Sequence, residues 1–551
     1  MTLFISLTLY FNLKMKQTRH KRLQNSFYLL VLFLFLSCGS NSAILSTPIE
    51  NIDLIPLKTE ELTEKEKKEW SHLDLKTDTV PGVSLHRAYK ELVKAKSKTV
   101  IVAVIDSGVD TDHEDLKDNL WVNPNEIPNN GKDDDSNGYV DDVNGWNFLG
   151  DANNEQLEYV RIVASGDTNN PRYLEAKKLL DEEYATTSRM KKQYDQILEQ
   201  LTVSDAAIAK HLKKPVYSKE EVDAIMTPDF DLIGHVNIIK QAFGFGFETI
   251  EACMNDLKAG LKVYNERLDY NLNINFDGRK AVGDNPNDLN DRNYGNGDVR
   301  AKNGRTHGTH VSGIIAAKRN NAIGIDGAAN DVKIMAIRNT PNGDEYDKDV
   351  ALGVYYAVDN GAKVINMSFG KQFSPQSEWV RDAIAYAAEK DVLIIAAAGN
   401  DGENTDQINY FPNDQINNGA EVSNTFVKVG SIGPKYGSTL VAGYSNYGKN
   451  TVDVFAPGSE IYSTYPKDTY EFASGTSMAA PLVAGVAALI FSQYPKLSAA
   501  QVKHILITSG IAINKKVSLE SGTIVPFSEL SKSGKIMNAY NALIMASKLS
   551  K

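Results

Sequence analysis

The sequence predicts an α/β protein, with a mostly parallel sheet covered by helices on both faces. The first observation is a set of unbroken apolar, β-branched runs, which are typical of strands buried on both faces. These runs span 99–106, 332–337, 362–369, 392–399 and 426–432. The second is that helix-like stretches separate them, at 349–361, 378–391 and 475–494. Such alternation indicates βαβ units, whose functional sites lie at the carboxyl ends of the strands.

One block interrupts this alternation, because strand-like runs are missing between about 154 and 284. Within 171–201, apolar residues recur at helical spacing and predict an amphipathic helix: Tyr173, Leu180, Tyr184, Met190, Tyr194, Ile197 and Leu201. Ser218 and Glu221 form a capping-box pattern, and a further helix over 250–268 carries Cys253 as a buried residue. We therefore expect an inserted helical module at 155–283.

The N-terminus has the pattern of a targeting signal. Basic residues precede an apolar run from Phe27 to Leu36, which is too short to span a bilayer but suits a signal peptide. The run ends in FLSCGSNS, which resembles a bacterial lipoprotein signal, although Phe35 stands where that family usually has leucine. The resemblance implies a signal peptide at 1–38 and lipidation of Cys38. It also implies a lipid-anchored protein of the bacterial cell envelope, facing the periplasm or the exterior; the alternative is simple secretion.

Composition excludes several classes of protein. Of the 551 residues, 42% are hydrophobic and 23% are charged, as in soluble globular proteins. The formal net charge of −11 argues against a nucleic-acid partner. Two cysteines cannot build a disulfide framework. The polar segment 39–80 is expected to be an N-terminal linker, and its charge run at 59–70 to be solvated linker or helix.

Three short segments carry the residue types of a nucleophilic triad. Asp106 follows a buried strand in VAVIDSGVD, His307 lies in NGRTHGTHVSG, and Ser477 lies in FASGTSMAAP. A serine hydroxyl needs an adjacent base, and that base needs an acidic partner that holds its tautomer. The order Asp, His, Ser is the subtilisin order. A zinc site built on His307 and His310 is disfavoured, because no convincing third ligand lies nearby.

These motifs resemble those of the subtilisin-like serine proteases, the subtilase family. The resemblance covers about 80–150 and 285–550 and includes DSGVD, HGTHVSG, GTSMAAP, AAAGN, YSNYG and FAPG. It implies a catalytic domain over 81–551, interrupted by the insertion, that hydrolyses protein or peptide substrates through an acyl-enzyme intermediate without an organic cofactor. His307 would be the base, His310 a structural residue packed against the sheet, and Asn400 the side-chain donor of the oxyanion hole.

The resemblance also implies where the substrate binds. Its backbone would add as a strand between two segments, represented here by Ser368, Phe369 and Gly370 and by Ala397, Ala398 and Gly399. The small side chains at 396–398 are expected to leave room for a specificity pocket, and Phe369 to narrow one of its walls.

An acidic loop at 131–148 is a candidate calcium site. Five oxygen-bearing residues surround Gly138: Asp133, Asp135, Asn137, Asp141 and Asp142. Calcium prefers such clustered oxygen ligands, and the loop resembles those of EF-hands and some subtilases, although it lacks the closing glutamate. The alternative is a solvated acidic turn. A calcium ion here would stabilise the fold rather than take part in the chemistry.

Two other functions remain open. One is a catalytically silent binding or scaffold protein on the same fold, since fold does not determine function. The other is a calcium- or surface-binding adhesin built on the helical insertion. A complete set of Asp106, His307, Ser477 and Asn400 favours the protease.

Overall fold

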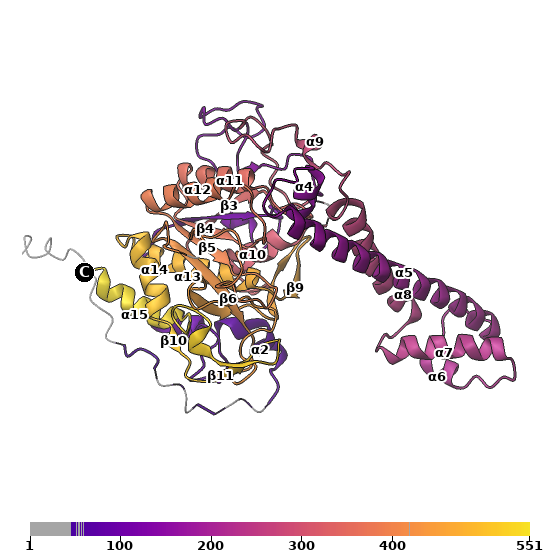
Figure 1. Cartoon of the computed structure of the whole chain (residues 1–551). Coiled ribbons are helices and arrows are strands. Elements are labelled where there is room, and N and C mark those ends of the chain that lie inside the picture. Colours follow the sequence, from indigo (N-terminus) through magenta and orange to yellow (C-terminus); the bar gives the residue numbers. More distant parts are fainter. Residues whose placement is uncertain are drawn as a thin grey trace, which may run out of the picture.

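The computed structural model describes residues 46–551 except 51, 53, 54, 57, 59, 303 and 418. Figure 1 shows a central sheet between two layers of helices and a long helical arm that projects from this body. The predicted α/β class is confirmed. Cys38 and the rest of the predicted signal peptide lie outside the described residues.

The central sheet has nine strands in the order β10-β13-β7-β6-β5-β4-β1-β3-β2. The pairings from β13 to β2 are parallel, and β10 pairs antiparallel with β13 at one edge. All five predicted strands are present. The strands are β1 (Val100–Asp106), β2 (Gly145–Asn147), β3 (Val332–Arg338), β4 (Val364–Met367), β5 (Leu393–Ala397), β6 (Phe426–Ile432), β7 (Val454–Pro457), β10 (Ile511–Ala512) and β13 (Lys535–Ile536).

Successive strand residues face the two helical layers. Val102 and Val104 of β1 belong to one core cluster, and Ala103 and Ile105 belong to the other. The first cluster is covered by α3 (Leu85–Glu91), α10 (His307–Ala316), α13 (Thr476–Gln493), α14 (Ala499–Thr508) and α15 (Ala539–Leu549). The second is covered by α11 (Asp347–Asp359) and α12 (Ser377–Glu389). Burial of both faces explains why the strands are apolar throughout.

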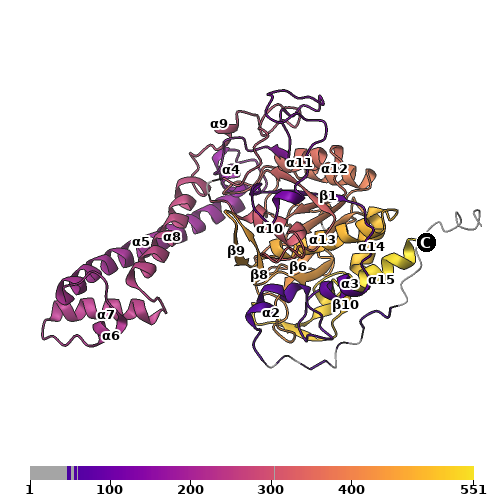
Figure 2. The same ribbon diagram turned by 180° about the vertical axis from the view of Figure 1, so that it is seen from behind.

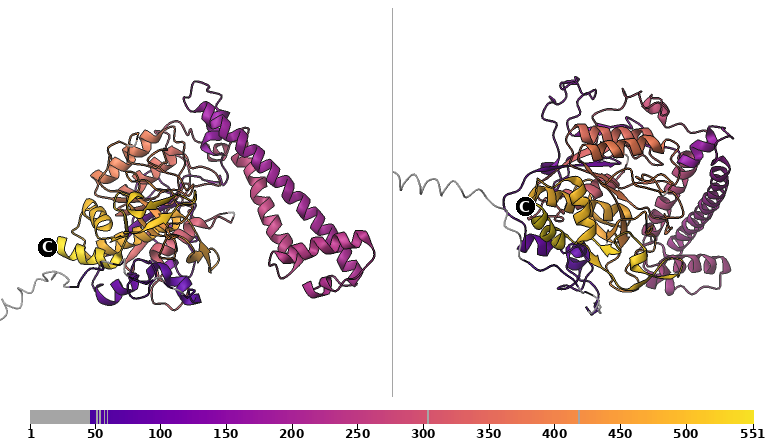
Figure 3. Two further views of the ribbon diagram at one scale, coloured as in Figure 1. Left: turned by 60° about the horizontal axis from the view of Figure 1, so that its bottom comes forward. Right: turned by 60° about the vertical axis from the view of Figure 1, so that its left-hand side comes forward.

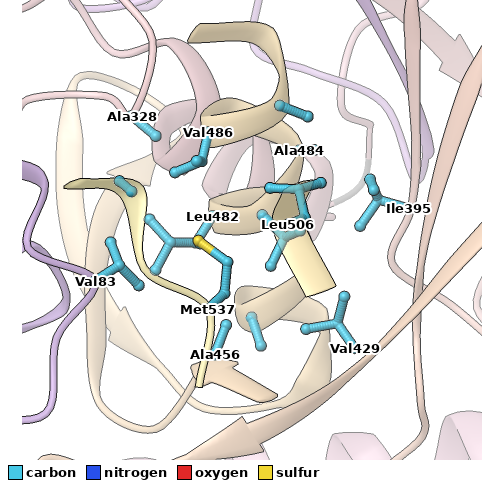
Figure 4. Packing of buried hydrophobic residues seen from close by; sticks show 14 of the residues in the cluster. Val83, Ala328, Ile395, Val429, Ala456, Leu482, Ala484, Val486, Leu506 and Met537 are labelled. Atoms are coloured by element: carbon cyan, nitrogen blue, oxygen red, sulfur yellow. The ribbon is translucent and has the colours of Figure 1, made fainter. Parts of the chain in front are cut away.

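Helix α13 runs through the middle of the first cluster. Its Leu482 and Val486 pack among Leu506, Ile395 and residues from β6 and β7 (Figure 4). Within the described part of the chain, it is the one helix long and apolar enough to cross a membrane, but 89% of it is buried inside the protein. We therefore assign α13 as a core helix.

The N-terminal segment differs from the predicted solvated linker. Helix α2 (Glu64–Glu69) begins with a capping box between Thr63 and Glu66, and η2 (Trp70–His72) follows it directly. The Trp70 side chain is 1% exposed, and its indole N–H donates to the carbonyls of Ser459 and Glu460. The predicted alternative of a helix is present in the charge run, but a purely solvated linker was wrong for the described part of this segment, because its scattered apolar residues belong to the main core.

The predicted helical module forms the arm. It contains α4 (Glu158–Ala164), α5 (Tyr173–Leu212), α6 (Lys219–Asp223), α7 (Phe230–Gly244), α8 (Ile250–Glu266), the π-helical turn η4 (Arg267–Asn271) and α9 (Arg279–Val282). Helices α5 and α8 pair along the arm, which points away from the sheet in Figures 1 and 2 and in the left view of Figure 3. The Ser218–Glu221 capping box is present. Exact domain limits at 155 and 283 remain predictions.

The far end of the arm has a small core of its own. Leu201, Ile208, Ile239 and Phe243 pack around Cys253, which is 6% exposed as expected for a packing residue. Tyr184 and Ile197, predicted to face a core, are instead about half exposed, at 50% and 48%. A pair of helices buries only a narrow stripe along each helix, so residues beside that stripe stay in solvent.

Buried charges fix the base of the arm to the body. Arg161 of α4 pairs with Glu158 and donates to the carbonyls of Asp344 and Glu345 at 2.9 and 3.1 Å. Lys371, 5% exposed, donates to Glu158 at 2.7 Å. Burial by itself would raise the pKa of Glu158, but Arg161 and Lys371 lower it to about 2. The carboxylate is therefore charged and fully partnered, as buried ions must be.

Smaller elements complete the body. They are the hairpins of β8 (Ile461–Tyr465) with β9 (Thr469–Ala473) and of β11 (Lys516–Ser518) with β12 (Ile524–Pro526), and the 3₁₀ turns Lys117–Asn119 and Phe527–Glu529. The β8–β9 hairpin lies beside α10, on the side of the body from which the arm projects (Figures 1 and 2).

Candidate active site

Asp106 and His307 meet where β1 ends and α10 begins. The Nδ1 atom of His307 lies 2.8 Å from Oδ1 and 3.0 Å from Oδ2 of Asp106. Gly308 permits this approach, because a Cβ atom there would lie 2.3 Å from the carbonyl oxygen of Gly108. Asp106 itself is 1% exposed and also accepts from the backbone N–H of Ser107. The carboxylate is thus held in one orientation towards the imidazole.

The environment of His307 favours its protonated form. Burial lowers the pKa of the imidazole, but the charge of Asp106 and its hydrogen bond outweigh burial, so the net pKa is raised. With 38% of its side chain exposed, the ring is still accessible from solvent. The pair therefore has the properties of a general base whose conjugate acid is stabilised.

Ser477 lies in the first turn of α13, beside the carboxyl end of β4. Its Oγ donates to the carbonyl of Ser368 at 2.8 Å, and the Ser368 Oγ donates to the Ser477 carbonyl at 2.9 Å. That second contact is available because Pro481, four residues further along, has no N–H for the Ser477 carbonyl. Among the described contacts, the Ser477 hydroxyl does not bond to His307; in this rotamer it bonds to the segment after β4.

Asn400 lies in the loop after β5, beside the start of α13. Its Oδ1 accepts from the backbone N–H and the hydroxyl of Thr476, at 2.8 and 3.0 Å. Asn400 is exposed, and its side-chain Nδ2 has no hydrogen-bond partner in the part of the chain that the structure describes. The amide therefore presents a fixed donor next to Ser477.

The expected substrate-binding segments lie on either side of this helix start. The N–H of Gly399 donates to the Thr476 hydroxyl at 3.1 Å, opposite the contact of Ser368 with Ser477. Ala397 and Ala398 are 3% and 0% exposed and face the main core, so their backbone rather than their side chains borders the site.

One detail of the expected specificity pocket was wrong, and one residue was missed. Phe369 does not narrow a wall, because it is 9% exposed and packs in the core cluster under α11 and α12. The side chain that does lie between the two segments is Tyr410, whose ring approaches both Gly370 and Gly399. Sequence reasoning missed Tyr410, because it lies in a loop without periodic pattern.

His310 has a structural position, as expected, but against a different element. It is 1% exposed, and its Nε2 lies 3.1 Å from the carbonyls of both Ile461 and Glu471. It therefore connects α10 to the β8–β9 hairpin rather than to the central sheet. Burial is the main reason why its pKa is lowered to about 4.

The acidic loop contains a tighter cluster than predicted. Ligand atoms of Glu126, Asp133 and Asp135 lie within 4.8 Å of one another, and the Oε2 of Glu126 is buried without a hydrogen-bond partner in the described residues. Glu126 was missed because it precedes the loop. Asp141 and Asp142 are engaged elsewhere: Asp141 accepts from the N–H groups of residues 130 and 131, and Asp142 accepts from Asn123, Asn137 and Tyr356.

Comparison with known families agrees with this geometry. The model of the Subtilase family matches residues 97–523, well over half of the chain. This chain belongs to the subtilase family. Thermitase of Thermoactinomyces vulgaris is 42% identical over 197 residues, 36% of this subtilase and 64% of thermitase. Subtilisin DY of Bacillus licheniformis is 36% identical over 223 residues, which are 40% of this chain and 76% of subtilisin DY.

This subtilase thus spans less than two thirds of the length of thermitase. A solved structure titled "Proteases from Pseudoalteromonas arctica PAMC 21717" aligns over 87% of this chain and 97% of that chain, with 21% identity and a TM-score of 0.45. That score is too low to support a comparison of folds.

The buried His310 makes an acid-sensitive contribution to stability. Its pKa is about 4 in the fold against 6.5 as the ordinary value, so the unfolded chain binds more protons between these values. The stabilisation is present above pH 6.5 and is lost as the pH falls towards 4, amounting to about 3 kcal/mol. We expect His310→Gln to unfold more easily in urea at pH 7 but to lose less stability than the parent between pH 6.5 and 4.

The matched control is His504→Gln, which changes an exposed histidine of α14. It should follow the parent at every pH. An equal acid-induced loss in the parent and in His310→Gln would contradict the assignment.

Proposed function

We propose that this subtilase is a serine endopeptidase that hydrolyses peptide bonds of proteins or peptides through Asp106, His307 and Ser477. The observation that carries the proposal is the contact of 2.8 Å between His307 Nδ1 and the buried Asp106 carboxylate. It leaves the other imidazole nitrogen, Nε2, as the basic atom of the ring.

The reaction begins when the Ser477 hydroxyl turns from the Ser368 carbonyl towards His307. Its Oγ attacks the peptide carbonyl while His307 takes its proton; the proton then passes to the leaving amine as the acyl-enzyme forms. A water molecule then attacks the acyl-enzyme while His307 takes its proton, and the proton returns to Ser477 as the carboxylic acid product leaves. Asp106 keeps the imidazole in the required tautomer and stabilises the imidazolium, in line with the raised pKa of His307.

Two donors would stabilise the developing oxyanion. Asn400 offers its Nδ2, and its orientation is set by the bonds from Thr476 to Oδ1. The backbone N–H of Ser477 lies in the first turn of α13, where N–H groups have no partner within the helix. Both donors are fixed before the reaction, which is the condition for effective transition-state stabilisation.

We expect Ser477→Ala and His307→Ala to abolish hydrolysis of casein and labelling by a fluorophosphonate probe. The loss in kcat should approach about 10⁶-fold, as in subtilisin. Asn400→Ala should lower kcat by about 10²–10³-fold, the effect of removing one oxyanion donor in subtilisin, while KM changes little. Kinetics on a chromogenic peptide would measure these effects.

Ser474→Ala is the matched control, because Ser474 is exposed and, among the described residues, its hydroxyl accepts from the N–H of Glu460 alone. It should retain parent activity. If the parent itself neither labels nor cleaves, the alternative of a silent binding protein on this fold stands instead.

We further propose that Glu126, Asp133 and Asp135 bind a structural calcium ion. The donor set is all carboxylate oxygen, which suits this hard cation, and the buried unpartnered Oε2 of Glu126 fits the group. The role is stabilisation of the loop that leads into β2, away from the residues that react. Asn137 is a weaker candidate, since its Oδ1 accepts from the N–H of Tyr139.

Calcium should raise the melting temperature, because a ligand that binds only the folded state adds about 2.7 kcal/mol at a hundredfold excess over its Kd. The parent should melt at a lower temperature in chelator than in calcium. Asp133→Asn combined with Asp135→Asn should remove this difference. Asp134→Asn removes a neighbouring charge that lies outside the cluster. This variant should keep the difference in melting temperature between calcium and chelator. No difference in the parent would rule out the site.

Finally, we propose that lipidation of Cys38 anchors the protein to a membrane of the bacterial cell envelope. The support is the sequence alone: basic residues, an apolar run and FLSCGSNS. Cys38→Ala should move the protein from the membrane fraction to the soluble fraction, whereas Cys253→Ala, in the arm, should not. Unchanged fractionation of Cys38→Ala would favour simple secretion.

A further inference from the structure

The ring of Tyr410 occupies the space between the two segments beside Ser477. Its hydroxyl donates to the carbonyl of Gly370 at 3.3 Å. A Cβ atom on Gly370 would lie 2.5 Å from Cε1 of Tyr410, and one on Gly399 would lie 2.5 Å from its Cζ. The phenol ring therefore touches both glycines, and neither wall has a side chain that could move aside.

This space is where a substrate side chain would enter. Ser368 and Gly399 are each hydrogen-bonded to the first turn of α13, one to Ser477 and the other to Thr476. The two segments therefore flank the nucleophile. A peptide bound between them as an added strand would direct the side chain on the acyl side of the scissile bond between Gly370 and Gly399.

The ring is held in place from its backbone. The next residue, Phe411, exchanges two backbone hydrogen bonds with Lys371, at 3.0 and 2.9 Å. The carbonyl of Tyr410 accepts from the buried Lys428 at 2.9 Å. Burial also raises the pKa of the phenol well above its ordinary value, so it remains a neutral donor to Gly370. The backbone that carries the ring is therefore fixed, and turning the ring aside would break the hydrogen bond from its hydroxyl to Gly370.

We propose that Tyr410 is a specificity-determining residue that fills this pocket and restricts the residue on the acyl side of the cleaved bond to glycine, alanine or serine. The proposal rests on the proposed endopeptidase function. A larger side chain would have to displace a packed ring, and overpacking a close-packed site is unfavourable. Discrimination at such a site is about 10–200-fold per methylene-sized change.

The test uses two peptide p-nitroanilides that differ only in the residue before the cleaved bond, alanine or phenylalanine. In the parent, kcat/KM for the alanine substrate should exceed that for the phenylalanine substrate by at least about tenfold. Tyr410→Gly should raise kcat/KM for the phenylalanine substrate by about 10–100-fold and reverse the preference. Tyr410→Phe keeps the ring and should keep the parent preference.

Tyr386→Ala, which removes a half-buried tyrosine of α12 that bonds to Asp359, is the control and should behave as the parent. Fluorophosphonate labelling reports whether each variant is folded at the site. If Tyr410→Gly fails to label, Tyr410→Ala, which also removes the ring, is measured in its place and should show the same gain for the phenylalanine substrate.

The outcomes separate the two proposals. A parent that labels and cleaves but prefers phenylalanine overturns the role of Tyr410 alone. If Tyr410→Gly is labelled by the fluorophosphonate probe but still prefers the alanine substrate, the role of Tyr410 is overturned as well. A parent that neither labels nor cleaves either substrate overturns the proposed function, and the role of Tyr410 with it.

Discussion

The contact between the Asp106 carboxylate and the His307 imidazole is the constraint around which the rest of the site is arranged. A carboxylate that is 1% exposed is costly to bury, and it is retained here because a backbone N–H and an imidazole partner it. For the two to meet, β1 and α10 must approach at backbone distance. That approach requires glycine at 308, because any side chain there would collide with the carbonyl of Gly108.

Helix α13 plays the corresponding part for Ser477, the proposed nucleophile. It is buried along most of its length, so its start is fixed relative to the sheet. Its first turn then supplies fixed contacts on both sides: Ser477 with Ser368, and Thr476 with Asn400 and Gly399. The proposed catalytic groups are thus held by the core of the protein, while loops such as the one that carries Tyr410 surround them.

The arm is joined to the same region by charge. Lys371 follows the substrate-binding segment directly and pairs with Glu158 at the arm's base. At the other end of the arm's base, Glu266 accepts from Asn342 at 3.1 Å and lies 3.8 Å from Arg305, two residues before His307. The base of the arm is therefore anchored beside two segments that lead to the proposed site, although its far end points away from the sheet in the left view of Figure 3.

The sequence by itself determined five of the nine sheet strands and the helices that separate them, because burial on both faces and the helical period are local signals. Its ordered motifs also predicted Asp106, His307 and Ser477 as the reactive residues. It also indicated a helical module at 155–283, since the helical period is local too. Tertiary structure alone placed Trp70 in the core and brought Glu126 into one cluster with Asp133 and Asp135. It also placed His310 within hydrogen-bond distance of the β8–β9 hairpin. It also decided that Tyr410 stands between Gly370 and Gly399. The contacts of Trp70, His310 and Tyr410 join residues distant in the chain, and the approach of Glu126 to Asp133 and Asp135 depends on how an irregular loop turns, so no periodic pattern along the sequence encodes them.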